Sequence, residues 1–488
     1  MKSLFCLKAL NISLLFSSAL ALQAQVGAPF IHDPSTLAEC DGKYYTFGTG
    51  ENGILSEDGG YTWHAGAIRP HRGAAPDCIK IGDRYLVAYS ATGGGLGGSH
   101  SGQVLTMWNK TLDPNSPDFA YTEPIVVATS EDGDDCDAID AGLLLDPTTG
   151  RLWLTYGTYF GYIRLVELDP ETGARVEGNQ PVNVAIDCEA SDLIYRDGWY
   201  YLLGTHGTCC DGVNSTYNIV CGRSRTVTGP YLDNTGRSML QGGGKIIIAA
   251  HDRVTGPGHF GWIHCGEGVE KMSCHFEADF DMGGYSTLGI RPLLWRDGWP
   301  TAGRNLRGGV YELESVRHGY ALELSVNFVR LQHERARHWG VDTVQAKKKL
   351  PMQTLEEVKA GWPEGEIGVR IGDYMVRPHQ RWEIQPVEGV GGYMGQPYFR
   401  IVIAGTDRAL AANELCELTT VPHFTGAPEQ LWQIDQATDG TYRIMPRQVP
   451  GIETRLCLMS IADSTPTLGI YDPNNDNCKW NLRQDVVE

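Results

Sequence analysis

Residues 189–206 read EASDLIYRDGWYYLLGTH, and the order of residue types in this stretch decides the predicted fold. A carboxylate, Glu189, precedes the turn pair Asp197-Gly198 and an aromatic-rich run that ends in Gly and Thr. Turn residues next to alternating, aromatic-rich runs are typical of a β-hairpin. The stretch therefore predicts a hairpin with an acidic side chain near the start of its first strand.

The same signal occurs three more times earlier in the chain. The runs after the turns read KYYTFGTG at 43–50, RYLVAYSAT at 84–92 and RLWLTYGT at 151–158. The acids before them are Asp33 in HDPS, Asp77 in APDC and Asp140 in AIDA. Recurrence at roughly 40–70 residues predicts propeller blades, each a small antiparallel sheet around a common axis. If each acid opens the innermost strand of its blade, all four lie at one end of that axis.

A fifth, weaker hairpin is predicted from HFGWIHCGE at 259–267 and MSCHFEADFD at 272–281. The sequence therefore predicts a five-bladed β-propeller over residues 25–305. Within it, SEDGGYTW at 56–63 matches a turn of several propeller proteins, in which Ser and Asp brace a hairpin and Trp packs between strands. We assign this turn a structural role.

A different, three-fold repeat follows, in which an aromatic strand leads to a leucine and then to a tryptophan. The strands begin at Tyr311, Phe399 and Tyr442, the leucines are Leu322, Leu410 and Leu456, and the tryptophans are Trp382, Trp432 and Trp480. The tryptophans are 50 and 48 residues apart. This repeat resembles the ricin-type β-trefoil, so a β-trefoil-like domain is predicted over 306–488. The longer first repeat predicts an insertion at about 330–377 that includes a short helix. Whether this domain binds carbohydrate stays open.

The N-terminus predicts export. Residues 1–24 contain two lysines and then an apolar run that gives way to small residues, the pattern of a cleaved signal peptide. The expected location is periplasmic or extracellular, and no later segment is apolar enough to predict a membrane span.

Composition narrows the class of protein. The 60 glycines, 12 tryptophans and 22 tyrosines favour an all-β fold. The formal charge of −19, without a basic stripe, argues against a nucleic-acid partner. Cys6 lies in the predicted signal, and the other twelve cysteines are expected to be buried thiols or disulfides in comparable measure. No cysteine or histidine spacing indicates a zinc site.

Residues 28–300 resemble glycoside hydrolase family 43, and within it the α-L-arabinanases. The resemblance is carried by HDPS at 32–35, GTYFGYIRLVELD at 157–169, CCDGVNSTYNIVCGRSRTVTGPYLD at 209–233, GPGHFG at 256–261 and YSTLGIRPLLWRDGWP at 285–300. It implies hydrolysis with inversion, for which one carboxylate activates water and another protonates the leaving oxygen.

The resemblance also implies roles for individual residues. Asp33 is the expected base and Glu189 the expected acid, and Asp140 is expected to position Glu189 and to raise its pKa by its negative charge. Each acid has the plainer alternative of capping a turn, and Asp77 is interpreted as structural. The sequence departs from the arabinanases at Ala74, where they have a sugar-stacking Trp, and at Ala141, where they have Pro.

Further residues are assigned by resemblance alone. The expected substrate contacts are His32, Thr158, Tyr159, Asn214 and Ser215, and turn packing is an equally good interpretation of the last four. His259 in GPGHFG matches a histidine that holds a hydrated calcium ion on the propeller axis. Because calcium prefers six to eight oxygen ligands, waters would supply most of them. No organic cofactor is expected.

The predicted function is hydrolysis of α-L-arabinofuranosyl linkages in plant cell-wall polysaccharide, with endo action on 1,5-α-L-arabinan as the leading hypothesis. The alternatives are an exo-acting α-L-arabinofuranosidase or β-xylosidase on the same fold, and a glycan-binding propeller without activity. The complete set of three acids argues against the last. A sialidase is disfavoured because only one turn of the 56–63 type is visible.

Overall fold

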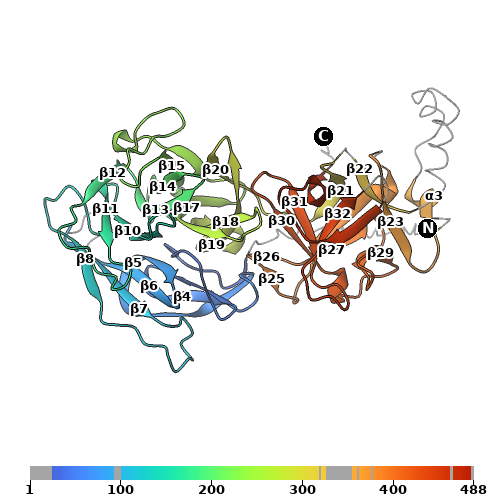
Figure 1. The fold of residues 1–488 in the computed structure, drawn as a ribbon, viewed down its shortest axis with the longest axis horizontal. Helices are drawn as coiled ribbons and strands as arrows, with labels where there is room; N and C mark the ends of the chain where they lie inside the picture. Colours follow the sequence, from blue (N-terminus) through green and yellow to red (C-terminus); the bar gives the residue numbers. More distant parts are fainter. Residues whose placement is uncertain are drawn as a thin grey trace, which may run out of the picture.

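The computed structural model describes residues 25–92, 100–317, 320–325, 354–359, 362–374, 377–461 and 465–484. The chain is all-β and forms two domains side by side, a propeller (blue to green) and a second domain (orange to red) (Figure 1). The predicted fold class is therefore confirmed. The predicted signal at 1–24 and, within the predicted insertion, residues 330–353, 360–361 and 375–376 lie outside the described ranges. Within those ranges, no helix has the length and apolar character needed to cross a bilayer.

Five four-stranded blades form the propeller. The first contains β2 (Ala38–Cys40), β3 (Lys43–Phe47), β4 (Gly50–Ser56) and the first part of β5 (Thr62–Ile81). The second contains the rest of β5, β6 (Arg84–Thr92), β7 (Gly102–Asn109) and β8 (Ile125–Ser130). The third contains β9 (Gly142–Leu145), β10 (Leu152–Tyr156), β11 (Tyr162–Leu168) and β12 (Val182–Ile186).

The fourth blade contains β13 (Glu189–Arg196), β14 (Trp199–His206), β15 (Asn218–Ser224) and β16 (Lys245–Ile248). The fifth contains β17 (Val254–His264), β18 (Glu270–Asp279), β19 (Tyr285–Arg296) and β20 (Trp299–Ala302). Short 3-10 turns η1 (Gly212–Asn214), η2 (Met239–Gln241) and η3 (Phe280–Met282) lie in the loops. Between β13 and β14, Asp197 and Gly198 both have positive φ, as a tight two-residue hairpin turn requires.

The ring is closed by the first described residues. β1 (Val26–Gly27) pairs in parallel with β5 of the first blade. A few residues later, the Pro29 carbonyl accepts a 2.8 Å hydrogen bond from the Leu288 amide in β19 of the fifth blade. The segment thus contacts both the first blade and the last and links the two ends of the ring.

The second domain is built from β21 (Gly309–Ser315), β22 (Tyr320–Leu324), β23 (Ile367–Asp373), β24 (Arg381–Pro386), β27 (Phe399–Ile403), β28 (Ala409–Ala412), β29 (Leu418–Val421), β30 (Trp432–Gln436), β31 (Tyr442–Pro446) and β34 (Trp480–Arg483), which form one sheet. Two hairpins, β25 (Gly392–Tyr393) with β26 (Gln396–Pro397) and β32 (Cys457–Ile461) with β33 (Thr465–Gly469), complete it. Turns η4 (Pro378–Gln380), η5 (Pro428–Gln430) and η6 (Asp476–Cys478) precede the three tryptophans.

The three tryptophans occupy equivalent places, as expected for a trefoil-like core. Each side chain is fully buried, and each indole N–H donates to a leucine carbonyl: Trp382 to Leu322 (2.9 Å), Trp432 to Leu410 (3.1 Å) and Trp480 to Leu458 (2.9 Å). The third leucine of the repeat is therefore Leu458, and the assignment of Leu456 is wrong. Two nearby leucines with the same pattern could not be told apart without the indole contact.

The predicted insertion is shorter than expected at its C-terminal end. β23, inside the stretch 330–377, pairs with β22 and β29 and so belongs to the domain's own sheet. A short helix does occur within the stretch, α3 (Leu355–Lys359). The sequence did not predict β23, because its alternation of apolar and polar residues is brief and the residues around it are strongly charged.

The turn at 56–63 has the predicted bracing role and also contacts the second domain. The Asp58 carboxylate accepts from the Ser56 hydroxyl (2.9 Å) and the Thr62 amide (2.7 Å), and Trp63 is fully buried. The backbone carbonyl of Asp58 also accepts a 3.1 Å hydrogen bond from the Gly392 amide of the second domain.

A buried ion pair also joins the two domains. Lys271 of β18 lies 3.3 Å from the Asp435 carboxylate of β30, and Arg443 of β31 donates to the same carboxylate at 3.0 Å. All three side chains are buried. Because buried charges are stable only when paired, this contact ties the domains together.

Candidate active site

Every blade has at least one non-glycine residue with a left-handed backbone within or shortly before its innermost strand. Taken one from each blade, they are Asp33 (φ 50°), Ala75 (41°), Asp140 (58°), Ala190 (45°) and His259 (58°). In the second, fourth and fifth blades the strand ladder also shifts register at this place. Such bulges and strained residues re-aim side chains and are held only by well-packed surroundings. The left-handed backbone thus recurs at one level of the propeller. Each of the three predicted acids either has this backbone conformation or is next to a residue that has it.

Asp33 lies among three histidines. Its Oδ2 atom is 2.9 Å from Nδ1 of His32 and accepts a 2.5 Å hydrogen bond from the Thr49 hydroxyl. Its Oδ1 atom is 3.7 Å from Nδ1 of His259 and 3.8 Å from Nδ1 of His275. Burial by itself raises the pKa of Asp33, but the charge of His32 and the nearby His259 outweigh it and hold this pKa well below the usual value. Asp33 is therefore ionised, as a general base must be.

His32 holds this arrangement in place. Its second ring nitrogen, Nε2, lies 3.2 Å from the Glu277 carboxylate, and its ring packs on that of His275 with centroids 4.3 Å apart. Although burial opposes protonation, the adjacent Asp33 raises the pKa of His32. Each ring nitrogen of His32 thus faces a carboxylate, Nδ1 that of Asp33 and Nε2 that of Glu277. In this structure His32 therefore positions Asp33.

Glu189 has the opposite environment. Its side chain is buried, the Tyr217 hydroxyl donates to Oε1, and the Thr158 hydroxyl donates to Oε2 at 3.0 Å. Burial raises the pKa of Glu189 to about 7, against the lowering effect of these two hydrogen bonds, and the charge of Asp33 adds to the increase. The group therefore keeps a proton near neutral pH, as a general acid must.

Asp140 is linked to Glu189 through the backbone. Its Oδ2 atom accepts a 3.0 Å hydrogen bond from the amide of Ala190, the residue that follows Glu189, and its own amide donates to Ser90. Burial and the charge of Glu189 raise the pKa of Asp140 well above its usual value. The expected positioning contact is present, and the two carboxyls repel each other when both are ionised. Burial, and not an ionised Asp140, is the main reason that the pKa of Glu189 is high.

Tyr217 and His275 connect the two carboxyl environments, and the sequence did not single them out. The Tyr217 ring lies 6.1 Å from that of His275 (centroid to centroid), and His275 contacts Asp33. Asp33 and Glu189 therefore belong to one cluster. His275 and Glu277 were interpreted only as part of a blade strand. Their spacing of two residues, which places both side chains on one face of β18, was the available signal.

The remaining predicted substrate contacts divide into two groups. Thr158 and Tyr159 lie beside Glu189, and burial together with its charge raises the pKa of Tyr159 to about 12. The Ser215 hydroxyl instead donates to the Thr208 carbonyl at 2.7 Å and braces its own loop. Asn214 is exposed at the end of η1.

Asp77 has structural contacts, as predicted. One carboxylate oxygen accepts from the Thr36 amide (3.0 Å) and the other from the Leu143 amide (2.8 Å). These bonds join the second blade to the first and third blades. Both carboxylate oxygens of Asp77 thus accept backbone hydrogen bonds.

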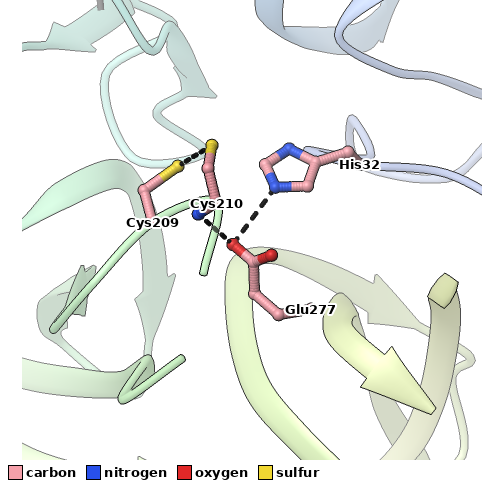
Figure 2. Close-up of side chains that lie close together, drawn as sticks. All are labelled: His32, Cys209, Cys210 and Glu277. Carbon is pink, nitrogen blue, oxygen red and sulfur yellow. Dashed lines mark hydrogen bonds and ion pairs between the residues drawn. The ribbon is translucent and has the colours of Figure 1, made fainter. Parts of the chain in front are cut away.

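Besides the cluster of His32, Asp33 and His275, two groups of side chains among the described residues could hold a metal ion. His259 is buried and, among the described residues, no hydrogen-bond partner lies within reach of its Nδ1 atom. An imidazole beside the Asp33 carboxylate fits a cation bound mainly through water, as expected for calcium at this residue. The second group is His32, Cys209, Cys210 and Glu277, whose ligand atoms all lie within 4.8 Å of one another (Figure 2). This second group was not predictable from the sequence, because its residues come from three separate segments of the chain.

A cavity of about 490 Å³ lies away from these carboxyls. It is lined by residues of the N-terminal segment, the fifth blade, the segment that connects the domains and β26, among them Gln25, Asp252, Arg291, Arg307 and Gln396. None of the predicted catalytic residues lines it.

Comparison with known proteins identifies relatives of the propeller. Residues 54–300 match the family described as glycosyl hydrolases family 43. Extracellular endo-alpha-(1->5)-L-arabinanase 1 of Bacillus subtilis (strain 168) is 31% identical over 327 residues, which cover 61% of this chain and 96% of that protein. Extracellular exo-alpha-(1->5)-L-arabinofuranosidase ArbA of Cellvibrio japonicus (strain Ueda107) is 30% identical over 307 residues, or 55% of this chain and 85% of that protein. The crystal structure of exo-1,5-alpha-L-arabinanase from a bovine ruminal metagenomic library matches with 31% identity and a TM-score of 0.52, covering 57% of this chain and 99% of the other.

Proposed function

Because this chain belongs to glycosyl hydrolase family 43, we propose that it is an exported, inverting glycosidase that cleaves α-L-arabinofuranosyl linkages inside 1,5-α-L-arabinan chains. The names of its relatives support this substrate. The observation that carries the mechanism is the contrast between the surroundings of two carboxyls of one cluster: Asp33 is half-buried among three histidines, and Glu189 is buried and accepts hydrogen bonds from two hydroxyl groups. Asp33 has a lowered pKa and Glu189 a raised one. Two carboxyls whose environments separate their pKa values are the mark of a base and an acid.

In this mechanism Asp33 takes a proton from water as the water attacks the anomeric carbon. Glu189 gives its proton to the departing glycosidic oxygen on the opposite face of the sugar. His32, held by Glu277, fixes the orientation of Asp33. Asp140, through the Ala190 amide, fixes the backbone beside Glu189. Displacement in one step from the face opposite the leaving group inverts the anomeric configuration.

The kinetic test compares Asp33→Asn with Glu189→Gln on arabinan and on an aryl arabinofuranoside with a good leaving group. Asp33→Asn should abolish hydrolysis of both substrates, because water loses its base. Glu189→Gln should lower activity on arabinan by about 10²–10⁴-fold and spare the aryl substrate, whose leaving group needs little protonation. Asp187→Asn, a change at an exposed carboxyl two residues away, is the matched control. Equal losses on both substrates in Glu189→Gln would contradict the acid role.

Exo action on the same linkage is the second candidate, because two of the relatives have exo activity in their names. Product analysis on linear 1,5-arabinan separates the two. Endo action gives a ladder of oligomers from the earliest times, whereas exo action gives one short product throughout.

We further propose that His259 holds a mostly water-coordinated calcium ion. The buried imidazole next to Asp33 supports this proposal. Such an ion would supply fixed positive charge and ordered water close to the base. Elemental analysis of the purified protein should find calcium that is lost in His259→Ala and after chelation, together with a lower unfolding temperature. Calcium content that is unchanged in His259→Ala would refute the assignment.

Export is proposed from the N-terminal pattern at 1–24 and is supported by relatives named as extracellular. N-terminal sequencing of the protein released by its native host should begin near residue 25. An intact N-terminus at Met1 would contradict it.

A further inference from the structure

We propose that Cys209 and Cys210 are joined by a disulfide in the exported enzyme, and that this disulfide forms a sugar-contacting surface between Asp33 and Glu189. The proposal names part of the substrate site and so rests on the proposed function. The bond itself can be tested without it.

The sulfur positions favour a bond over a shared metal ion. The two Sγ atoms are 2.6 Å apart, and both cysteines reach solvent, Cys210 more than Cys209. Two thiolates on a tetrahedral zinc ion, at about 2.3 Å each, would lie about 3.7 Å apart. A disulfide requires about 2.05 Å. The distance between the two sulfurs is therefore nearer to that of a disulfide than to that of two zinc-bound thiolates. His32 and Glu277, which are also residue types that bind metals, lie beside the pair.

The location of the pair connects it with both catalytic candidates. The Cys210 amide donates to Glu277 Oε1 at 2.8 Å, and the same oxygen faces His32 (Figure 2). His32 in turn contacts Asp33. On the other side, Cys209 interacts with Tyr217, whose hydroxyl donates to Glu189. The pair therefore lies between the base and the acid.

Oxidation can proceed by thiol–disulfide exchange with an external disulfide oxidant, R–S–S–R. Cys210 is the more exposed of the two thiols, so it is the one that an external oxidant reaches first, and it reacts as its thiolate. This thiolate attacks the oxidant, forms a Cys210–S–S–R bond and releases one R–S⁻. Cys209 then gives up its proton and attacks the Cys210 sulfur, which releases the second R–S⁻. The protein loses two electrons and its thiol protons, and the oxidant leaves as two thiols.

Bond formation changes the surface that faces the sugar. The two thiols beside Glu277 and Tyr217 are replaced by an apolar disulfide, against which the carbon face of a furanose can pack. The ring formed between adjacent residues also restricts the loop at 207–216, so less conformational freedom is lost when a sugar binds. Because adjacent residues are closer than most disulfide-bonded pairs, the bond should be easily reduced.

The bond is tested by mass spectrometry on full-length protein from an oxidising compartment. The protein is denatured with N-ethylmaleimide, without reductant, and cut before aspartates. Peptide 197–210 then contains only Cys209 and Cys210, and peptide 211–232 contains only the buried Cys221. We expect peptide 197–210 to be unmodified and two hydrogens lighter than the dithiol, and to take two labels after reduction. Peptide 211–232 should take one label at once.

The surface role is tested by kinetics on linear arabinan. A mild phosphine reductant should raise KM about three- to tenfold with little change in kcat, because the loop leaves its binding position part of the time. The double variant Cys209→Ser/Cys210→Ser should have the higher KM from the start and should not respond to reductant. Cys416→Ser, at a partly exposed thiol in the second domain, should keep the wild-type response.

Three results would overturn the proposal. Labelling of both cysteines before reduction, or a bond from either to another cysteine, would exclude the disulfide. Stoichiometric zinc in protein from the same preparation would favour a metal site instead. A KM that reductant does not change would exclude the surface role. Absence of arabinan hydrolysis would defeat the proposed function and leave the mass-spectrometric result intact.

Discussion

Removing the hydroxyl of Tyr217 should shift the pH dependence of the enzyme toward alkaline values. Tyr217 and Glu189 are both buried, and the tyrosine hydroxyl donates to the carboxylate. A hydrogen bond to a charged group is worth about 1.5–3 kcal/mol, and one pKa unit corresponds to about 1.36 kcal/mol. Tyr217→Phe should therefore raise the pKa of Glu189 by about 1–2 units.

The direction follows from which form of Glu189 is active. The hydrogen bond stabilises the ionised form, so its loss favours the protonated form, which is the general acid. In the wild type, kcat/KM on arabinan should fall on the alkaline side with a midpoint of about 7, set by the pKa of Glu189. In Tyr217→Phe the midpoint should lie at about 8–9. The ring is kept in this variant, so its packing against His275 should persist.

The assay is initial-rate hydrolysis of arabinan from pH 4 to 10, with the aryl substrate in parallel. Thr158→Val removes the second hydrogen bond and should shift the midpoint in the same direction, and Tyr285→Phe, at an exposed tyrosine, should not shift it. Glu189→Gln should remove the alkaline limb. The acid role of Glu189 would be refuted if the midpoint in Tyr217→Phe stayed at 7 or fell. It would also be refuted if activity of Glu189→Gln still declined at alkaline pH.

Three further outcomes concern stability. Folding raises the pKa of Glu189 from 4.5 to about 7, so the folded state keeps a proton that the unfolded state releases, and stability is lost as pH rises between these values. Between pH 4 and pH 8, the stability of Glu189→Gln relative to wild type, measured by urea unfolding, should rise by about 3 kcal/mol, and an equal difference at both pH values would contradict this. Asp435→Ala leaves Lys271 buried and unpaired and should lower the free energy of unfolding by about 3–5 kcal/mol, whereas Lys271→Met/Asp435→Leu should recover most of it. Trp432→Ala should cost about 3–5 kcal/mol by the same measurement, and a cost below about 1 kcal/mol would show that its site is not a shared core position.

The sequence by itself determined the features that depend on neighbouring residues. Turn pairs such as Asp197-Gly198 and the alternation around them specify hairpins locally, so the five blades could be counted before any contact was known. The repeated tryptophans likewise predicted a three-fold core, because each repeat contains the same local pattern of residues. The positions of Asp33, Asp140 and Glu189 before successive hairpins placed them at one level of the propeller.

Only the tertiary structure decided what surrounds those residues. Leu458 was distinguished from Leu456 by a contact with Trp480, and β23 was recognised by the strands it pairs with. His275 and Tyr217 reach the carboxyls from segments far from Asp33 in the sequence. The protonation states were equally hidden, because a pKa depends on burial and on charges that only folding brings close. The physical reason is the same in each case: a strand or a turn is fixed by residues next to one another in the chain, whereas acid–base chemistry is fixed by residues that meet across blades.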